Sequence, residues 1–266
     1  MIVIADNLSV RNRDYMSAVE RKDEKAIAGM AKGLAASHSD LINVQCSLDG
    51  AGDEERLPWA AEVVENATGL GVSLDTRNLE ALKKAFSLLK NPPLVNYISL
   101  TEPENRDEFF PLAARERAYI VLRASKGIIP MTFEGKLQIL EELLEAANAA
   151  DIPNERLFLD PSIVHLGRGS GQDHILNARE CILAVQDMID PPANSIAWIS
   201  NVSVGMHKKE RKQVEAAFLL YLAGAGLDAA MVDVLDPQVQ RALYLVKAFR
   251  AEIVFTPADM AIHAQA

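Results

Sequence analysis

Small polar side chains stand at the ends of short apolar segments in this chain. The apolar residues 196–199 stop at Ser200 and Asn201, and four other segments stop at a carboxylate or an amide. These four end residues are Asp75, Asn96, Asp160 and Asp233. A carboxylate accepts hydrogen bonds, whereas an amide both donates and accepts them. The set therefore predicts a pocket for a heterocycle that is rich in hydrogen-bonding groups.

The same segments do not indicate covalent catalysis. No Ser or Cys stands in a nucleophile elbow, and no Lys ends a strand as Schiff-base chemistry requires. A single Asp or Asn at such a turn is usually a turn former or a helix cap. Five polar ends in repeated segments are harder to explain in that way. We therefore expect a site that orients a ligand and adjusts one proton.

A metal or phosphate site has weaker support. His165 and His174 could join Asp160 in a site with two histidines and one carboxylate, but their spacing matches no familiar metal motif. The glycine-rich run 167–171 lacks the GK[ST] ending of a phosphate loop, so a flexible lid is the favoured interpretation. Asp173 is expected to cap the following helix. We expect no tightly bound metal.

The composition limits the class of protein. The 266 residues are 49% hydrophobic and 24% charged, which predicts a folded chain with a large core. The net charge of −10 argues against nucleic-acid binding, and the basic run 207–212 is expected to be the solvated start of a helix. Cys46 and Cys181 are isolated, as expected in a reducing cytoplasm. No signal peptide or membrane-spanning segment is evident.

Eight apolar segments alternate with helical patterns. The expected strands are residues 2–5, 41–46, 72–75, 94–99, 119–122, 157–160, 196–199 and 229–232. Helices are expected between and after them, with Asp53 and Asn78 as caps and Asn105 near the start of a looser helix. This order predicts a parallel sheet, and eight repeats favour a (β/α)8 TIM barrel in a single domain, residues 1–266. The polar strand ends would then meet at the active rim.

Several short motifs follow the order typical of one enzyme family. They are Ser73-Leu74-Asp75-Thr76-Arg77-Asn78, Asn96-Tyr97-Ile98-Ser99, Leu159-Asp160-Pro161, Gln172-Asp173-His174 and Ser200-Asn201-Val202-Ser203. Together they resemble the methyltetrahydrofolate:corrinoid/iron–sulfur protein methyltransferases, which belong to the wider pterin-binding barrels. The resemblance covers nearly the whole chain. It implies a (β/α)8 barrel, usually a homodimer, that holds a pterin at its rim.

The resemblance also implies a reaction. The pterin-binding residues would be Asp75, Asn96, Asp160, Ser200 and Asn201, with Asn201 facing N5. The N5-methyl group of methyltetrahydrofolate would move by SN2 transfer to Co(I) of a corrinoid carried by a partner protein, such as a corrinoid/iron–sulfur protein, or in reverse. The Asn201 carbonyl would accept a hydrogen bond from protonated N5, an assistance worth about 10²–10⁴-fold in rate.

Some positions depart from the family's usual pattern. They are Ser9, Leu41, Gln45, Tyr97 and Val204. These departures leave two other functions open. One is a condensation like that of dihydropteroate synthase, although Ser200-Asn201-Val202 stands where that family has Ser-Arg-Lys. The other is a non-catalytic barrel that binds a pterin or a corrinoid protein.

Overall fold

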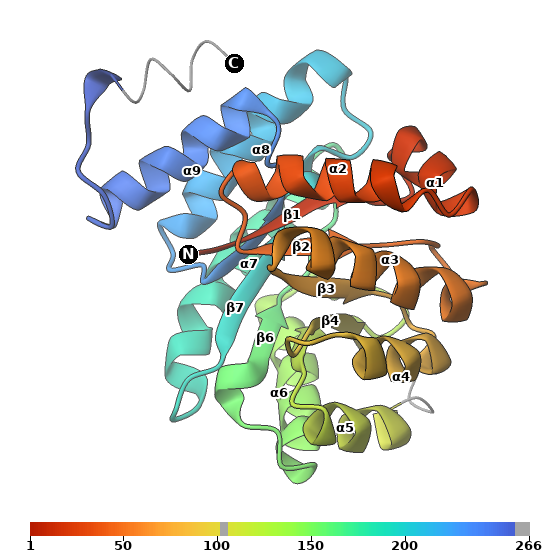
Figure 1. Ribbon diagram of the computed structural model, residues 1–266. Helices are drawn as coiled ribbons and strands as arrows, with labels where there is room; N and C mark the ends of the chain where they lie inside the picture. Colours follow the sequence, from red (N-terminus) through yellow and green to blue (C-terminus); the bar gives the residue numbers. More distant parts are fainter. Residues whose placement is uncertain (102–105, 259–266) are drawn as a thin grey trace.

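Eight parallel strands close into a barrel in which neighbours in sequence pair with each other and β8 pairs back to β1. The computed structural model describes residues 1–101 and 106–258 (Figure 1). The strands are β1 Ile2–Leu8, β2 Leu41–Val44, β3 Gly71–Asp75, β4 Leu94–Ile98, β5 Tyr119–Arg123, β6 Leu157–Asp160, β7 Asn194–Trp198 and β8 Ala229–Val232. The predicted (β/α)8 barrel is confirmed.

Helices cover the outside of the barrel (Figure 1). They are α1 Arg13–Glu20, α2 Glu24–Ala36, α3 Asp53–Thr68, α4 Leu79–Leu88, α5 Arg106–Arg115, α6 Phe133–Ala149, α7 Gly171–Met188, α8 Lys208–Ala223 and α9 Pro237–Phe249, with short 3-10 helices η2 Asn154–Arg156 and η3 Ile199–Ser203. The expected helix position Asn105 lies outside the described residues. Helix α1 was not predicted; Asn12 caps it by accepting from the N–H groups of Asp14 and Tyr15 at 3.1 Å.

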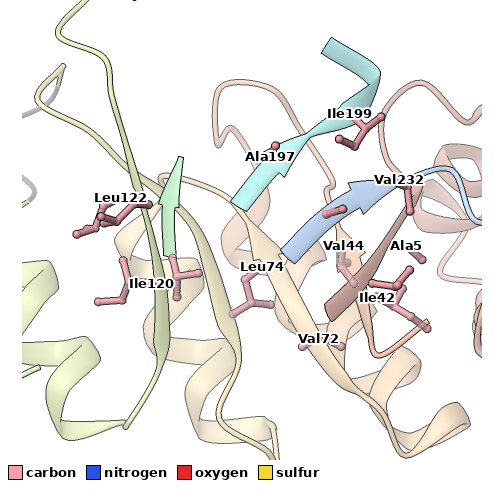
Figure 2. Packing of buried hydrophobic residues seen from close by; sticks show 14 of the residues in the cluster. Ala5, Ile42, Val44, Val72, Leu74, Ile120, Leu122, Ala197, Ile199 and Val232 are labelled. Carbon is pink, nitrogen blue, oxygen red and sulfur yellow. The ribbon is translucent and has the colours of Figure 1, made fainter. Parts of the chain in front are cut away.

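Alternate residues of the strands form two separate apolar layers. One layer packs against the helices and includes Val72 and Leu74 of β3 and Ile120 and Leu122 of β5 (Figure 2). The other fills the barrel interior with Ile4, Leu94, Val121, Phe158, Ile196, Ala229 and Met231. Because side chains alternate between the two faces of a strand, the residue two positions further on also points inward. At the C-terminal rim these residues are Asp6, Asn96, Arg123, Asp160, Trp198 and Asp233.

Some strand ends differ from their expected positions. β1 extends to Leu8 and β5 to Arg123, because backbone pairing continues beyond the apolar run: Leu8 pairs with Val44, and Arg123 pairs with Asp160. β7 ends at Trp198, and the segment that follows it forms η3 instead of continuing the strand. The polar rim therefore begins inside β1 and β5, beyond the apolar runs that predicted their ends.

The helix starts give a mixed outcome. Asn78 caps α4 as expected, and the basic run 207–212 does lie at the start of α8. Asp53 is not a cap, because its carboxylate instead accepts from the Thr76 hydroxyl at 2.5 Å. Asp173 is not a cap either; it lies in the first turn of α7, two residues after the helix begins at Gly171. None of the described helices is long and apolar enough to cross a membrane.

Candidate functional site

A cavity of about 210 Å³ opens at the C-terminal ends of the strands. Its lining residues are Asp6, Ser9, Arg11, Gln45, Ser47, Leu48, Gly50, Asp75, Thr76, Arg77, Tyr97, Arg123, Trp198 and Asn201. Because barrels of this kind carry their active sites at this end, the cavity is the candidate site.

Two carboxylates lie close together in the cavity. Nδ2 of Asn43 donates to Oδ1 of Asp6 at 3.1 Å and to Oδ2 of Asp75 at 3.4 Å, and Nε2 of Gln45 donates to that same Asp75 oxygen at 2.9 Å. Burial, and next the Asp75 carboxylate, raise the pKa of Asp6 to about 7. Burial also raises the pKa of Asp75 to about 6, against the hydrogen bonds from Asn43 and Gln45. The pair can therefore hold a proton close to neutral pH.

Two buried amide oxygens beside these carboxylates are unsatisfied. Oδ1 of Asn43 and Oδ1 of Asn96 make no hydrogen bond within the described residues. Asn96 pairs in register with Asp75, and its Nδ2 contacts Sδ of Met231 at 3.7 Å. A buried acceptor without a donor costs about 1–3 kcal/mol. A heterocycle with several N–H groups would supply such donors, so these residues fit a ligand of that class.

Arg123 lies over two aromatic rings in the wall of the cavity. Its Cζ is 4.4 Å from the centroid of the Tyr97 ring and 5.8 Å from that of Trp198. Its Nε donates to Oγ of Ser162 at 2.9 Å and lies 3.5 Å from Oδ2 of Asp160. These contacts fix a flat cation and aromatic surface next to the carboxylates, which suits the binding of a planar ring.

Asp160 is held in a buried turn and does not line the cavity. Its Oδ1 accepts from the N–H of Ser162 at 2.8 Å, and burial raises its pKa while Arg123 opposes that effect. Lys136 of α6 donates its ammonium to the carbonyls of Pro161 at 2.7 Å and Ser162 at 2.5 Å. Burial lowers the pKa of Lys136 to about 8. The hydrogen bonds of this buried lysine therefore hold the turn after β6 in place.

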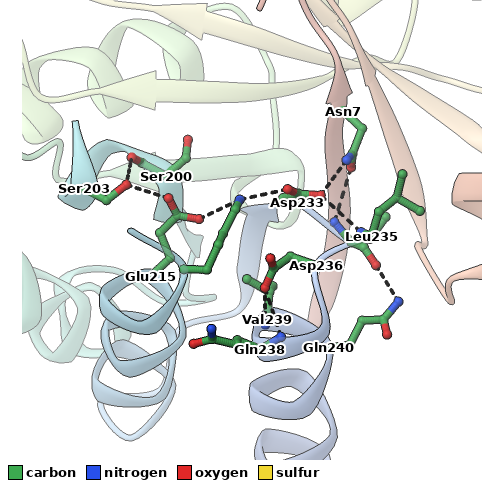
Figure 3. Close-up of polar contacts among 12 residues, drawn as sticks. Asn7, Ser200, Ser203, Glu215, Asp233, Leu235, Asp236, Gln238, Val239 and Gln240 are labelled. Carbon is green, nitrogen blue, oxygen red and sulfur yellow. Dashed lines mark hydrogen bonds and ion pairs between the residues drawn. The ribbon is translucent and has the colours of Figure 1, made fainter. Parts of the chain in front are cut away.

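The turn that carries Asn201 is anchored by a polar network (Figure 3). Within η3, the Ser203 hydroxyl donates to Oε1 of Glu215 at 2.5 Å, and Glu215 is only 4% exposed. Nζ of Lys212 donates to Oε2 of Glu215 at 3.0 Å and to Oδ2 of Asp233 at 2.8 Å. Lys212 is therefore not simply solvated, since it connects the turn after β7 to the end of β8.

The predicted site residues come together only in part. Asp75 and Asn201 line the cavity. Asn96 and Asp160 lie outside its lining and are buried at inward-facing positions of β4 and β6. The buried Ser200 hydroxyl has no hydrogen-bond partner within the described residues. Asp233 accepts from both Lys212 and Asn7, so its carboxylate is already engaged.

Other cavity residues were not predicted to bind. Asp6, Arg123 and Trp198 each lie two positions after an apolar residue of the barrel interior, and this alternation is the signal that could have found them. Of the positions that depart from the family pattern, Ser9, Gln45 and Tyr97 line the cavity. Among the others, Leu41 packs inside the barrel and Val204 is exposed.

The three residues of the possible metal site do not come together. His165, His174 and Asp160 do not gather, and no group of three or more potential metal ligands occurs in residues 1–101 and 106–258. The N–H of Leu166 donates to the carbonyl of Val202 at 2.9 Å, which ties this loop to η3.

Comparison with known proteins gives a family and a relative. The model of a family described as pterin binding enzymes matches residues 42–233. The chain is also 27% identical over 252 residues to a methylcorrinoid:tetrahydrofolate methyltransferase of Eubacterium limosum, with 93% of this chain and 90% of the relative covered.

Solved structures show the same fold. A Yersinia pestis DHPS, solved with a pterine-sulfa conjugate, matches with a TM-score of 0.69 at 15% identity, and 94% of each chain is covered. A dihydropteroate synthetase solved with product matches with the same TM-score, identity and coverage. At this identity the likeness is one of fold alone.

Proposed function

Because the chain belongs to the family of pterin-binding enzymes, we propose that it transfers a methyl group between N5 of tetrahydrofolate and a corrinoid carried by a partner protein. The observation that carries this proposal is the cavity, which is lined by the carboxylates of Asp6 and Asp75 at the C-terminal rim, with the unsatisfied amide oxygens of Asn43 and Asn96 buried beside them. The name of the relative from Eubacterium limosum supports the choice of reaction within the family.

Hydrogen bonding explains how the cavity would hold the pterin. A reduced pterin has an amino group and ring N–H groups, which are donors, and Asp75, Asn96 and Asp160 offer acceptors from β3, β4 and β6. Asp160 would need its turn to present the carboxylate to the ring. The Tyr97 and Trp198 rings give the pterin an aromatic wall.

Asn201 would act at the methyl-bearing nitrogen, next to Ser200. When a methyl group leaves N5, the carbon–nitrogen bond breaks, its electron pair stays on nitrogen and N5 takes a proton. In the opposite direction N5 forms the bond to carbon and loses that proton. The Asn201 amide oxygen can accept a hydrogen bond from N5–H once N5 is protonated, which lowers the barrier because it stabilises the protonated form, from which the amine leaves more readily.

The partner, the assembly and the location are part of the same proposal. The corrinoid supplies the methyl donor or acceptor and would arrive on its own protein, so this chain needs no resident metal.

We propose a homodimer, because exposed apolar side chains of α7 and α8 form a shallow groove, among them Leu176 and Tyr221. The two cysteines are buried free thiols, which fits the cytoplasm.

Titration with methyltetrahydrofolate tests the proposal, followed by a transfer assay with a reduced corrinoid protein. We expect binding, and we expect Asp75→Ala and Asp160→Ala to weaken it. A surface variant, Asp14→Ala, is the matched control because Asp14 lies on α1 and does not line the cavity. Absence of binding, or equal binding by all four proteins, would contradict the pterin site.

Two other functions give different outcomes. A dihydropteroate-synthase-like enzyme would condense a pterin pyrophosphate with an aryl amine, and the fold likeness to such enzymes supports that alternative. However, Ser200-Asn201-Val202 places no cation after β7. A non-catalytic barrel would bind methyltetrahydrofolate but transfer no methyl group to any reduced corrinoid. The transfer assay and a condensation assay therefore separate the three functions.

A further inference from the structure

The carboxylates at the strand ends differ in how well they can hold a proton. Burial opposes the ionisation of Asp233, but the hydrogen bond from Lys212 outweighs it and lowers the pKa of this carboxyl. Asp160 lies outside the cavity lining. Asp75 accepts hydrogen bonds from two amides, which favour its charged form. Asp6 is therefore the carboxyl group of the cavity that is best suited to carry a proton.

One oxygen of Asp6 is open to the cavity. Its Oδ1 accepts from Nδ2 of Asn43 at 3.1 Å, whereas its Oδ2 accepts no hydrogen bond from residues 1–101 and 106–258. The side chain lines the cavity and is partly exposed. A proton on Oδ2 would therefore face a bound ligand directly, without a protein group between them.

The charges around Asp6 favour a proton on this side chain near neutral pH. Burial, and next the Asp75 carboxylate on β3, raise the pKa of Asp6 to about 7, and Asp233 beside β8 acts in the same direction. Arg11, in the loop after β1, acts against them. A ligand whose donors keep Asp75 ionised leaves a negative charge next to Asp6. The proton of the pair then stays on Asp6.

The end of β1 places Asp6 between the two parts of the proposed site. Around the barrel from β7 to β3, the strands are β8, β1 and β2, so Asp6 lies between Asn201 and Asp75. Asn7 fixes this strand end, because its Nδ2 donates to Asp233 at 2.6 Å and its Oδ1 accepts from the N–H of the residue after Asp233 at 3.2 Å (Figure 3). A pterin that is held by Asp75 and reaches Asn201 would pass in front of Asp6.

We propose that Asp6 is the catalytic acid of the methyl transfer and donates the proton that N5 takes. This rests on the proposed function, because it assumes that a methylated pterin occupies the cavity. The Asp6 O–H bond breaks and the lone pair of N5 takes the proton. The methyl carbon then bonds to the electron pair of the reduced corrinoid, and the pair of the broken carbon–nitrogen bond stays on N5. Asp6 regains a proton from solvent, and in the reverse direction its carboxylate takes the proton from N5.

The roles of Asp6 and Asn201 are therefore different. Asp6 moves the proton, whereas the Asn201 oxygen accepts a hydrogen bond from N5–H after the proton has arrived. General acid catalysis of this kind contributes about 10²–10⁴-fold in rate. The contribution depends on the protonation state of Asp6, so it must change with pH in opposite ways for the two directions of transfer.

Single-turnover transfer from methyltetrahydrofolate to free cobalamin reduced to Co(I) tests this proposal on the full chain. We expect the rate to fall about tenfold per pH unit above pH 7, because Asp6 then loses its proton. Asp6→Asn should transfer about 100-fold more slowly at pH 7 and lose this break, while it binds methyltetrahydrofolate within about threefold of normal. Any pH dependence that the variant retains belongs to the ligand.

Transfer from methylcobalamin to tetrahydrofolate gives a readout that a structural role of Asp6 would not change. Here the rate should rise with pH up to about 7, because Asp6 must be ionised to take the proton. Asp6→Glu keeps an ionisable carboxyl group and should restore the pH dependence in both directions. Asp49→Asn is the matched control, because Asp49 is an exposed carboxylate in the loop after β2 that does not line the cavity.

Other outcomes would overturn the role of Asp6. A break near pH 7 that persists in Asp6→Asn would assign the proton to another group. Losses of affinity and rate that are equal in Asp6→Asn would mean that Asp6 only helps to bind the ring, and slopes of the same sign in both directions would mean that it does not carry the transferred proton. Absence of transfer in both directions by the unmodified protein would instead contradict the proposed function, and with it any catalytic acid.

Discussion

At the scale of single residues, we expect Asp75 to control how pterin binding depends on pH. Burial raises its pKa to about 6, but only the ionised carboxylate accepts hydrogen bonds from two ring donors. The ligand therefore favours the charged form, and binding expels a proton when the pH is below 6. We expect the part of the affinity for methyltetrahydrofolate that depends on Asp75 to be constant above that pH and to fall about tenfold per unit below it. Calorimetry between pH 5 and pH 8 measures this slope.

Asp75→Asn provides the control for that slope. The variant keeps the size of the side chain but has no proton to lose, so any pH dependence it retains belongs to the ligand or to Asp6. We expect it to bind about 10- to 100-fold more weakly at pH 7, since a carboxylate acceptor is replaced by an amide. A slope identical to that of the unmodified protein would mean that Asp75 does not meet the ring.

Asn201 is expected to affect turnover more than binding. Its amide lies at the cavity wall, and in the proposed reaction its oxygen contacts N5–H only when N5 takes the proton that the methyl transfer requires. Asn201→Ala should bind methyltetrahydrofolate within about threefold of normal and transfer methyl about 100-fold more slowly. Single-turnover transfer to a reduced corrinoid protein measures the step. Normal turnover would remove Asn201 from the mechanism.

At the scale of secondary-structure elements, η3 depends on α8. The buried Glu215 accepts from Ser203 and Lys212, so its loss leaves a hydroxyl and an ammonium without that partner. Glu215→Ala should lower the free energy of unfolding by about 1–3 kcal/mol. It should also slow methyl transfer about tenfold, because η3 positions Asn201, with little change in pterin affinity.

Thermal melts and single-turnover rates test this prediction together. Glu210→Ala is a suitable control, because Glu210 is an exposed carboxylate in the first turn of the same helix. Glu215→Gln can still accept from Ser203 and should recover part of the rate. A loss of stability with a normal rate would show that the network supports the fold but does not position Asn201.

The strand ends explain how far the sequence could predict the site. Apolar runs located all eight strands, and Asp75 and Asn201 were found because they follow such runs directly. Asp6 and Arg123 were missed because each of these two strands was predicted to end where its apolar run stopped, although backbone pairing continues to Leu8 in β1 and to Arg123 in β5. The inward positions Ile2, Ile4 and Asp6 show the alternation that would have corrected this.

No pattern in the sequence indicates that Lys136 is buried. It occupies the first turn of an amphipathic helix, where a lysine is normally solvated, and only the tertiary packing of α6 brings it to the carbonyls of Pro161 and Ser162, which follow β6. The burial of its ammonium is a property of the tertiary structure. A single sequence cannot distinguish it from the exposed lysines of other helices, such as Lys32 of α2.

At the scale of the whole molecule, the barrel uses its two ends and its outer surface differently. Polar inward residues at the C-terminal rim form the cavity, while the interior below it is filled by apolar side chains. The same alternation that builds the core therefore supplies the site, which explains why the fold and the pterin-binding family could both be recognised from short strand-end motifs. The outer surface of α7 and α8 belongs neither to the polar cavity nor to the buried core, and it carries exposed apolar side chains.

That apolar surface predicts a dimer. Leu176 is 56% exposed and Tyr221 38% exposed, and both border the groove between α7 and α8. In a two-fold dimer this patch packs against the same patch of the partner subunit. A single substitution therefore changes the interface twice, removing two contacts and adding two charges. We expect sedimentation to show a dimer and Leu176→Glu to weaken it about 100-fold or more. Leu88→Glu should leave it intact, because Leu88 is also exposed, at 42%, but lies on α4. A monomer at micromolar concentration, or equal effects of the two variants, would contradict this interface.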